Sequence, residues 1–182
     1  EPIEKGKGFV FENSVSVGKL PREFSVSVEQ GIQDSLGSGI LAGFSLIDLK
    51  VSLLSCNYEE DSTQLAFSIG AATAFQKGLK QADSILLEPS MKIEVILPMQ
   101  HTGDVIGDLN ARRGRVRGME ERAGVQVINA EAPLSEMFGY STQLRSLTQG
   151  RASYSMQFSH YIPVTDATRG ILTGEQPSFA EA

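Results

Sequence analysis

Residues 133–158 read PLSEMFGYSTQLRSLTQGRASYSMQF, and the apolar spacing changes halfway along this stretch. The first part predicts a helix that starts near Ser135 and ends before a left-handed Gly150. Its apolar stripe has helical spacing and consists of Leu134, Met137, Tyr140, Leu144 and Leu147. The second part alternates, which predicts a strand with one buried face made of Ala152, Tyr154, Met156 and Phe158.

The residues just upstream predict three more strands. Residues 91–97 alternate between apolar and charged side chains, as in a strand with one buried face. Residues 115–121 and 125–132 resemble two further strands, joined by a tight turn at Ala123-Gly124. These strands would give the final strand its partners.

A helix is predicted between the first two of these strands. Thr102 or Asp104 can cap its start, Gly114 ends it, and its apolar residues are Val105, Ile106 and Leu109. The resulting order is strand, helix, strand, strand, helix, strand. This order is typical of the ferredoxin-like βαββαβ plan, so we expect a four-stranded sheet with two helices on one face.

The N-terminal half predicts a second α+β domain. Residues 9–11 resemble a short strand, and Pro21 precedes a helix whose buried stripe is Phe24, Val28 and Ile32. Residues 46–54 alternate as a strand with one polar side.

A second helix of this half is predicted to begin at Asp61, with Gln64 completing a capping box. Small residues at Gly70, Ala71 and Ala74 would let another element approach closely. The apolar positions that indicate this helix are Leu65, Ile69, Ala72, Leu79 and Ala82.

A domain boundary is predicted at Leu87-Glu88-Pro89, because proline restricts the residue before it to an extended conformation. We therefore expect two small domains, 1–88 and 89–162, followed by a polar tail at 163–182.

Composition excludes several classes of protein. The 182 residues carry a net charge of −6, whereas general nucleic-acid binders are usually basic, so we expect no DNA partner. No apolar run is long enough for a membrane span, and the first residues do not resemble a signal peptide. The single cysteine, Cys56, cannot form an internal disulfide, which favours a reducing compartment.

The motifs of common catalytic and metal sites are weak or missing. Residues 37–42 match G-x-G-x-x-[GA], but a helix precedes them and a strand follows, the reverse of a dinucleotide site. His101 and His160 have no metal-ligand neighbours at useful spacing, and Cys56 has no identifiable base. We expect no catalytic residue and no metal site in these 182 residues.

Two charged clusters each have a structural and a functional interpretation. The acidic run Glu59, Glu60 and Asp61 fits a solvated loop before a helix, or a loop tip that meets another macromolecule. The arginines can complement a helix C-terminus or contact phosphates from one strand face. They are Arg112, Arg113, Arg115 and Arg117.

Several long strings resemble elongation factor G, a family of ribosome-dependent GTPases. LLEPSMKIEV (86–95), GDVIGDLNARRG (103–114) and residues 133–158 resemble its fifth, C-terminal domain. GILAGFSLID (39–48) and DSTQLAFSIGAATAFQKG (61–78) resemble its fourth domain. The likeness covers nearly everything from Gly8 to Tyr161.

The resemblance implies a fold and a role. It implies a partial domain IV similar to ribosomal protein S5, followed by a ferredoxin-like domain V. Relatives drive translocation of tRNA and mRNA in the cytoplasm; domain IV enters the decoding site, and domain V lies near the stalk base. The implied partners are rRNA, tRNA and mRNA on the ribosome. GTP and magnesium serve the full-length family, and no cofactor is expected for this chain.

The resemblance also implies a contact loop, and this loop departs from the family pattern. The second tip loop of domain IV corresponds to Asn57, Tyr58, Glu59, Glu60, Asp61 and Ser62. Relatives usually have a histidine after the tyrosine, where this chain has Glu59. The family's GTPase domain, domains II and III and first tip loop have no counterpart in the sequence, so we expect no GTP hydrolysis. A recycling paralogue and a stand-alone ribosome- or RNA-binding module remain alternatives.

Overall fold

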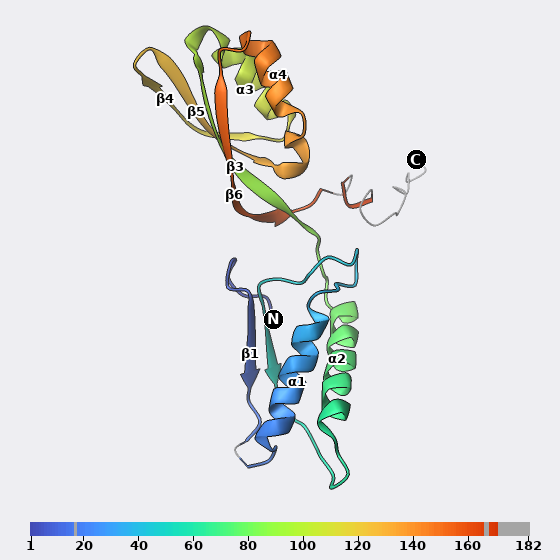
Figure 1. Ribbon diagram of the computed structural model, residues 1–182. Helices are drawn as coiled ribbons and strands as arrows, with labels where there is room; N and C mark the ends of the chain where they lie inside the picture. Colours follow the sequence, from blue (N-terminus) through green and yellow to red (C-terminus); the bar gives the residue numbers. More distant parts are fainter. Residues whose placement is uncertain (17, 166–167, 171–182) are drawn as a thin grey trace. The chain divides into compact units, whose positions relative to one another are not determined.

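The computed structural model describes residues 1–16, 18–165 and 168–170. These residues form two compact units (Figure 1). One unit is built from Glu1–Leu86 and includes the described residues after Val164, and the other is Leu87–Val164. In the described part of the chain, none of the helices has the length and apolar character needed to cross a bilayer.

The first unit contains two parallel strands and two helices. Strand β1 (Phe9–Asn13) pairs with β2 (Leu49–Leu53), and helix α1 (Arg22–Ser35) connects them. Helix α2 (Gln64–Gln81) follows β2 and packs along α1. The predicted stripe of Phe24, Val28 and Ile32 is buried, as expected.

Helix α2 uses a different face from the one that the sequence suggested. Leu65 and Ile69 are 68% and 59% exposed, and no residue of α2 is fully buried. The helix instead meets α1 through Phe67, whose ring stacks on Phe24 at 4.4 Å. A Cβ added at Gly31 would lie 2.2 Å from the backbone oxygen of Ser68, so the two helix backbones come very close there. The close approach therefore depends on Gly31 of α1.

Two boundaries in the first unit also differ from prediction. Helix α2 is capped by Thr63, whose Oγ1 accepts from the amide of Ala66 at 3.2 Å, and not by Asp61. Strand β2 begins only at Leu49, because Asp48 has a positive φ of 56°. The Asp48 carboxylate accepts hydrogen bonds from the amides of Gly6 and Gly8 at 3.0 and 2.9 Å, which lower its pKa.

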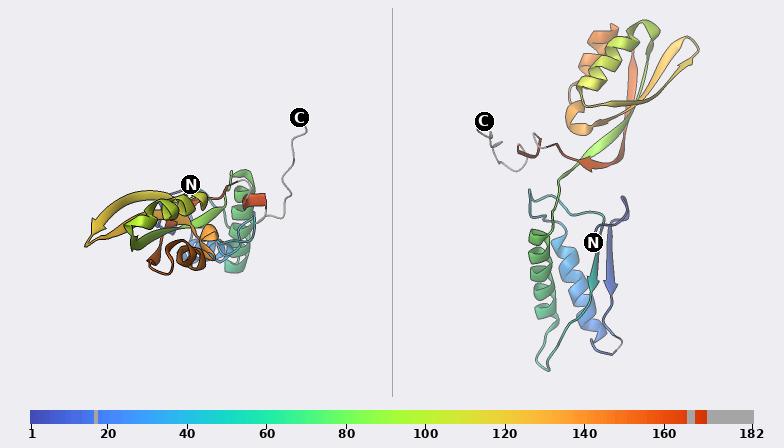
Figure 2. Two further views of the ribbon diagram at one scale, coloured as in Figure 1. Left: turned by 90° about the horizontal axis from the view of Figure 1, so that it is seen from above. Right: turned by 180° about the vertical axis from the view of Figure 1, so that it is seen from behind.

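The second unit has the predicted ferredoxin-like fold. Its order is β3 (Leu87–Pro98), α3 (Thr102–Ala111), β4 (Arg115–Arg122), β5 (Val125–Pro133), α4 (Tyr140–Thr148) and β6 (Ser153–Pro163). The strands form one antiparallel sheet in the order β4-β5-β3-β6. Both helices cover the same face of this sheet (Figures 1 and 2).

A closed apolar core lies between that face and the helices. Its members come from β3, β5, both helices and the turn before α4, and they alternate along the strands as the sequence pattern predicted. They are Ile93, Val95, Leu97, Val105, Leu109, Ile128, Ala130, Ala132, Met137, Tyr140 and Leu144. The predicted turn between β4 and β5 is present, with positive φ at Ala123 and Gly124.

Strand β6 is less buried than the sequence suggested. Tyr154 and Phe158 are 36% and 55% exposed, because β6 is an edge strand and the helices do not cover its outer side. Tyr154 still contacts the core, since its ring meets the edge of the Tyr140 ring at 5.1 Å.

The helix predicted from Leu134 onward is interrupted. A 3-10 turn at Leu134–Met137 is followed by extended Phe138 and by Gly139 at φ 74°, and α4 then begins at Tyr140. Ser135 does not cap this helix, because its hydroxyl donates to Glu88 at 2.7 Å. At the other end, Gly150 has the expected left-handed conformation, with φ 74°. Helix α3 likewise has no side-chain cap at its start, where Thr102 or Asp104 was predicted.

Candidate functional site

The predicted contact loop, Asn57–Ser62, connects β2 to α2. It lies at the end of the first unit where both helices begin (Figure 1). Its residues are exposed apart from Ser62, which is half-buried. The unit therefore presents a short polar loop at one end of a helix pair.

Two hydrogen bonds close the loop into a tight turn. The Ser62 amide donates to the carbonyl oxygen of Glu59 at 3.1 Å, and the Glu59 amide donates to the Ser62 hydroxyl at 2.9 Å. Thr63 then caps α2. The path of the backbone from Glu59 to Thr63 is thus fixed by local bonds on both sides of the turn.

The Tyr58 side chain packs against an aromatic ring on one side and is exposed to solvent on the other. Its ring centre lies 5.7 Å from that of Phe24, which in turn stacks on Phe67. Yet 47% of Tyr58 is exposed. The tyrosine is thus anchored to the helix pair while a large part of its side chain faces solvent.

Three acidic side chains stand beside Tyr58. Glu59, Glu60 and Asp61 are exposed, and their carboxylates have no hydrogen-bond or ion-pair partner among the described residues. The loop therefore carries a local negative charge. Cys56 precedes it as a half-buried free thiol, and its sulfur contacts the neighbouring carbonyl of Asn57 at 4.0 Å.

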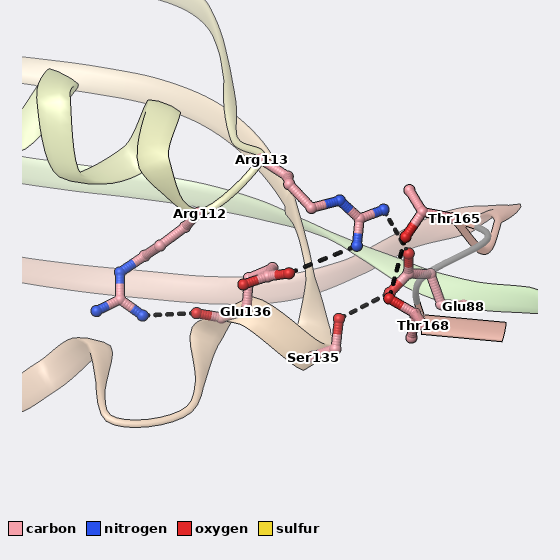
Figure 3. A network of polar contacts seen from close by, with 7 residues as sticks. All are labelled: Glu88, Arg112, Arg113, Ser135, Glu136, Thr165 and Thr168. Carbon is pink, nitrogen blue, oxygen red and sulfur yellow. Dashed lines mark hydrogen bonds and ion pairs between the residues drawn. The ribbon is translucent and has the colours of Figure 1, made fainter. Parts of the chain in front are cut away.

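The structure separates the four candidate arginines into two pairs. Arg112 is turned toward its own unit, where Nε donates to Asp108 at 2.9 Å and Nη1 donates to the carbonyl oxygen of Glu136 at 2.6 Å (Figure 3). Its guanidinium also lies 5.4 Å from the ring centre of Tyr140. Burial raises the pKa of the Tyr140 hydroxyl, so this tyrosine stays neutral at physiological pH.

Arg113 binds the start of β3. Its Nη2 donates to Glu88 at 2.7 Å, its Nη1 lies 3.5 Å from Glu136, and Ser135 donates to the other oxygen of Glu88 (Figure 3). Glu88 is only 5% exposed, so this ion pair compensates a buried charge. The arrangement is structural, and no sequence pattern indicated it, because Glu88 and Arg113 lie 25 residues apart.

Arg115 and Arg117 remain exposed on β4. Arg117 donates from Nε and Nη2 to one oxygen of Glu131, at 2.9 and 2.6 Å. Arg115 has no hydrogen-bond or ion-pair partner among the described residues and stands opposite Glu131 in the strand register. Both guanidinium groups are thus exposed to solvent, and Arg115 is the one without a carboxylate partner in the described part of the chain.

The sequence did not single out the neighbours of these arginines on the sheet. Lys92, Asn129 and Ser159 line a shallow hollow with Arg117 and Glu131. Lys92 and its partner Glu131 alternate with core residues, so they lie on the sheet face opposite the core. The sequence does place Lys92 on this face of β3, because Lys92 alternates with apolar residues. That Asn129 and Ser159 lie beside Lys92 follows only from the pairing of β3 with β5 and β6.

The other candidate residues from the sequence do not come together in a common site. His101 is buried and its Nε2 contacts Arg151 and Gln100 at 2.9 and 3.1 Å, whereas His160 contacts its neighbour Ser159. The glycine motif forms a tight loop, in which the Gly39 amide donates to the carbonyl oxygen of Phe44. Within the described residues, no group of three histidine, cysteine or acidic side chains could hold a metal ion.

Comparison with known proteins gives two family matches that follow one another along the chain. Residues 1–83 match the family model described as elongation factor G, domain IV, and residues 85–171 match the model described as elongation factor G C-terminus. A protein of Thermus thermophilus with a known crystal structure is similar, with 37% identity and a TM-score of 0.88. The similarity covers 96% of this chain but only 26% of that protein, so the chain spans about a quarter of its length. The chain belongs to the elongation factor G family, of which it represents domain IV and the C-terminal region.

Proposed function

We propose that this chain is the C-terminal part of a ribosome-dependent translation factor that promotes movement of tRNA and mRNA. The supporting observation is that both matched models belong to one family and follow each other in order. In this proposal the first unit enters the decoding site, and the Asn57–Ser62 loop is its leading point. The second unit lies near the stalk base of the ribosome.

The loop is suited to contact by shape and hydrogen bonding. The carboxylates of Glu59, Glu60 and Asp61 would repel phosphate groups, so charge attraction does not hold RNA at this loop. Tyr58 is exposed enough to offer its ring to a base for stacking, or its hydroxyl to a ribose 2′-OH. The turn between Glu59 and Ser62 keeps the tyrosine at a fixed place relative to α2.

The proposal assigns chemistry to other parts of the full-length protein. GTP and magnesium would bind outside these 182 residues, which we expect to have no GTPase activity alone. The proposed partners are rRNA and the tRNA–mRNA complex, and the proposed location is the cytoplasm.

A second candidate function is ribosome recycling by a specialised paralogue. Glu59 favours it, because relatives that promote translocation usually have histidine directly after the tyrosine. A carboxylate at this position would weaken any contact with the phosphates of the tRNA–mRNA complex.

The test uses the full-length protein with single changes in the loop. Tyr58→Ala should slow translocation by roughly tenfold if one stacking or hydrogen-bonding contact is lost. Glu59→His should raise the translocation rate if the acidic residue limits it. Rates of translocation and of subunit splitting would be measured for each variant on the same ribosomes.

A matched control is Glu29→His, which makes the same change on an exposed position of α1 away from the loop. This variant should behave like the unchanged protein in both assays. If the two loop variants also leave both activities unchanged, the loop does not contact the ribosome and the proposal fails. If only splitting responds to the loop changes, the recycling function is correct.

A further inference from the structure

The face of the four-stranded sheet that the helices leave open carries an unusual arrangement of charge. Glu131 of β5 stands between Lys92 of β3 and Arg115 of β4 in the strand register. Arg117 lies beside it and donates two hydrogen bonds to one of its oxygens. Glu131 thus binds one cation and has two more beside it in the strand register, while Glu94 of β3 is a second carboxylate on this face. Three cations and two carboxylates leave a net positive charge here.

A β-bulge brings Arg117 to this position. Val116 pairs with Ala130 and Gly118 pairs with Asn129, so Arg117 is an extra residue in β4 without a partner of its own on β5. The bulge allows Arg115 and Arg117 to approach the same carboxylate from one strand. Gly118 has no neighbouring atom within 4 Å of where a Cβ would stand, which leaves room beside the guanidinium.

The surrounding surface is hollowed and mixes polar with small apolar residues. Arg117, Lys92, Asn129 and Ser159 line a shallow hollow of about 610 Å³. The Ser159 hydroxyl contacts His160, and neither Lys92 nor the Asn129 side chain has a hydrogen-bond partner among the described residues. The hollow thus offers two cations and neutral hydrogen-bonding groups around one carboxylate, Glu131.

These features favour an anion over a base. No aromatic side chain of the described residues lines the hollow, so bases have no ring on which to stack. Arginine matches phosphate bidentately, and the Arg117–Glu131 pair is exposed enough to be exchanged at low cost, since exposed ion pairs contribute roughly 0–1 kcal/mol. Glu94, the next residue of β3 on this face, stands opposite Asn129 in the strand register and limits the positive region to the end of the sheet that holds Glu131.

We propose that this open sheet face binds the phosphate backbone of RNA through Lys92, Arg115 and Arg117, with Asn129 and Ser159 as hydrogen-bonding neighbours. Glu131 holds Arg117 in place when RNA is absent and competes with phosphate when RNA is present. The choice of RNA as the ligand rests on the proposed function, whereas the anion site itself rests on the geometry.

The test measures binding of the 182-residue chain to a short fluorescein-labelled RNA hairpin by fluorescence anisotropy, at several salt concentrations. The double variant Lys92→Ala/Arg117→Ala should bind RNA roughly tenfold more weakly. The slope of its log affinity against log salt concentration should fall by the equivalent of about two phosphate contacts. Glu131→Gln should bind about threefold tighter, because the competing carboxylate is gone. This change tests whether the carboxylate competes with phosphate, and the comparison with a cation removed elsewhere on β4 separates a specific site from a general effect of charge.

Arg122→Ala is the matched control. Arg122 is an exposed arginine on the same strand that pairs with Glu120, and its loss should change affinity less than about twofold. Circular dichroism should show that all variants fold, since each altered side chain is on the surface.

The proposal is overturned if the double variant binds RNA as the unchanged chain does, or if Glu131→Gln has no effect. It is also overturned if polyglutamate competes as well as RNA, because the face would then be a site for acidic protein. Tyr58→Ala, which changes the loop of the first unit, should leave RNA binding by the sheet face unchanged. The loop proposal and the sheet-face proposal can therefore fail independently of each other.

Discussion

The two units differ in how completely they bury their apolar side chains. In the second unit, eleven residues from two strands, both helices and a connecting turn form one closed core. In the described part of the first unit, only Phe24, Val28 and Ile32 are fully buried apolar residues, and all three belong to α1. Its second helix leaves Leu65 and Ile69 exposed.

This contrast indicates two ways of holding a small unit together. The second unit depends on burial of apolar area, which is spread over many residues. The first depends on a small apolar contact between α1 and α2, with the close approach at Gly31, and on polar bonds such as those to Asp48. The two units should therefore respond differently to the same kind of mutation.

The largest effect is expected in the core of the second unit. Ile93 is fully buried, and Ile93→Ala should lower the free energy of unfolding of that unit by about 2–5 kcal/mol. Leu65→Ala in α2 should change stability by less than about 0.5 kcal/mol, because the side chain is 68% exposed. Hydrogen exchange followed by mass spectrometry would measure each unit separately. A large cost for Leu65→Ala would contradict the contrast, because it would mean that another element covers α2.

A somewhat smaller effect is expected at the helix contact of the first unit. Gly31→Ala places a Cβ against the backbone of Ser68 and should destabilise the unit by about 1–3 kcal/mol. Gly70→Ala is the matched control, since nothing lies within 4 Å of its added Cβ. In a helix this second change should stabilise by about 0.5–1 kcal/mol. Urea unfolding of both variants gives the comparison, and equal effects would show that the helices do not meet at Gly31.

The smallest effect concerns pH. The amides of Gly6 and Gly8 lower the pKa of Asp48, so its folded pKa lies below the unfolded value of about 3.9. Its stabilising contribution is then present above that value and is lost as pH falls through the folded pKa. Asp48→Asn, which tolerates the positive φ, should remove this part of the acid sensitivity of the first unit.

An NMR titration of the Asp48 carboxyl carbon would measure this shift directly. A midpoint at or above that of free aspartate would contradict the hydrogen bonds to Gly6 and Gly8. The second unit should keep its own acid response in the Asp48→Asn variant, which provides an internal control.

The fold of the second unit could be predicted because its pattern of apolar and polar residues fits only one order of strands and helices. Residues 91–95 alternate strictly between apolar and charged side chains, and Ala123-Gly124 supports a tight turn. The exposure of Tyr154 and Phe158 could not be predicted in this way. Alternation shows which side chains share a face of a strand, but not whether the strand lies at the edge of its sheet.

Helix α2 shows the opposite case. Leu65 and Ile69 form one apolar stripe and Phe67 with Ala71 forms another, so hydrophobicity alone does not select the buried side. The glycine at position 31 decides it, because only its missing side chain lets α1 approach Ser68. Likewise, the arginines could be recognised as a cluster, but their division into Arg113 bound to Glu88 and the exposed pair on β4 depends on tertiary contacts.

The extra residue in β4 has a consequence for changes in chain length. Val116 and Gly118 pair with consecutive residues of β5, so deletion of Arg117 would leave the register of all other residue pairs of that hairpin unchanged. A one-residue deletion, normally harmful inside a strand, should here be silent for folding. Position 117 is thus a place where the hairpin can lose a residue, and with it a charged group, without a change in the pairing of its core residues.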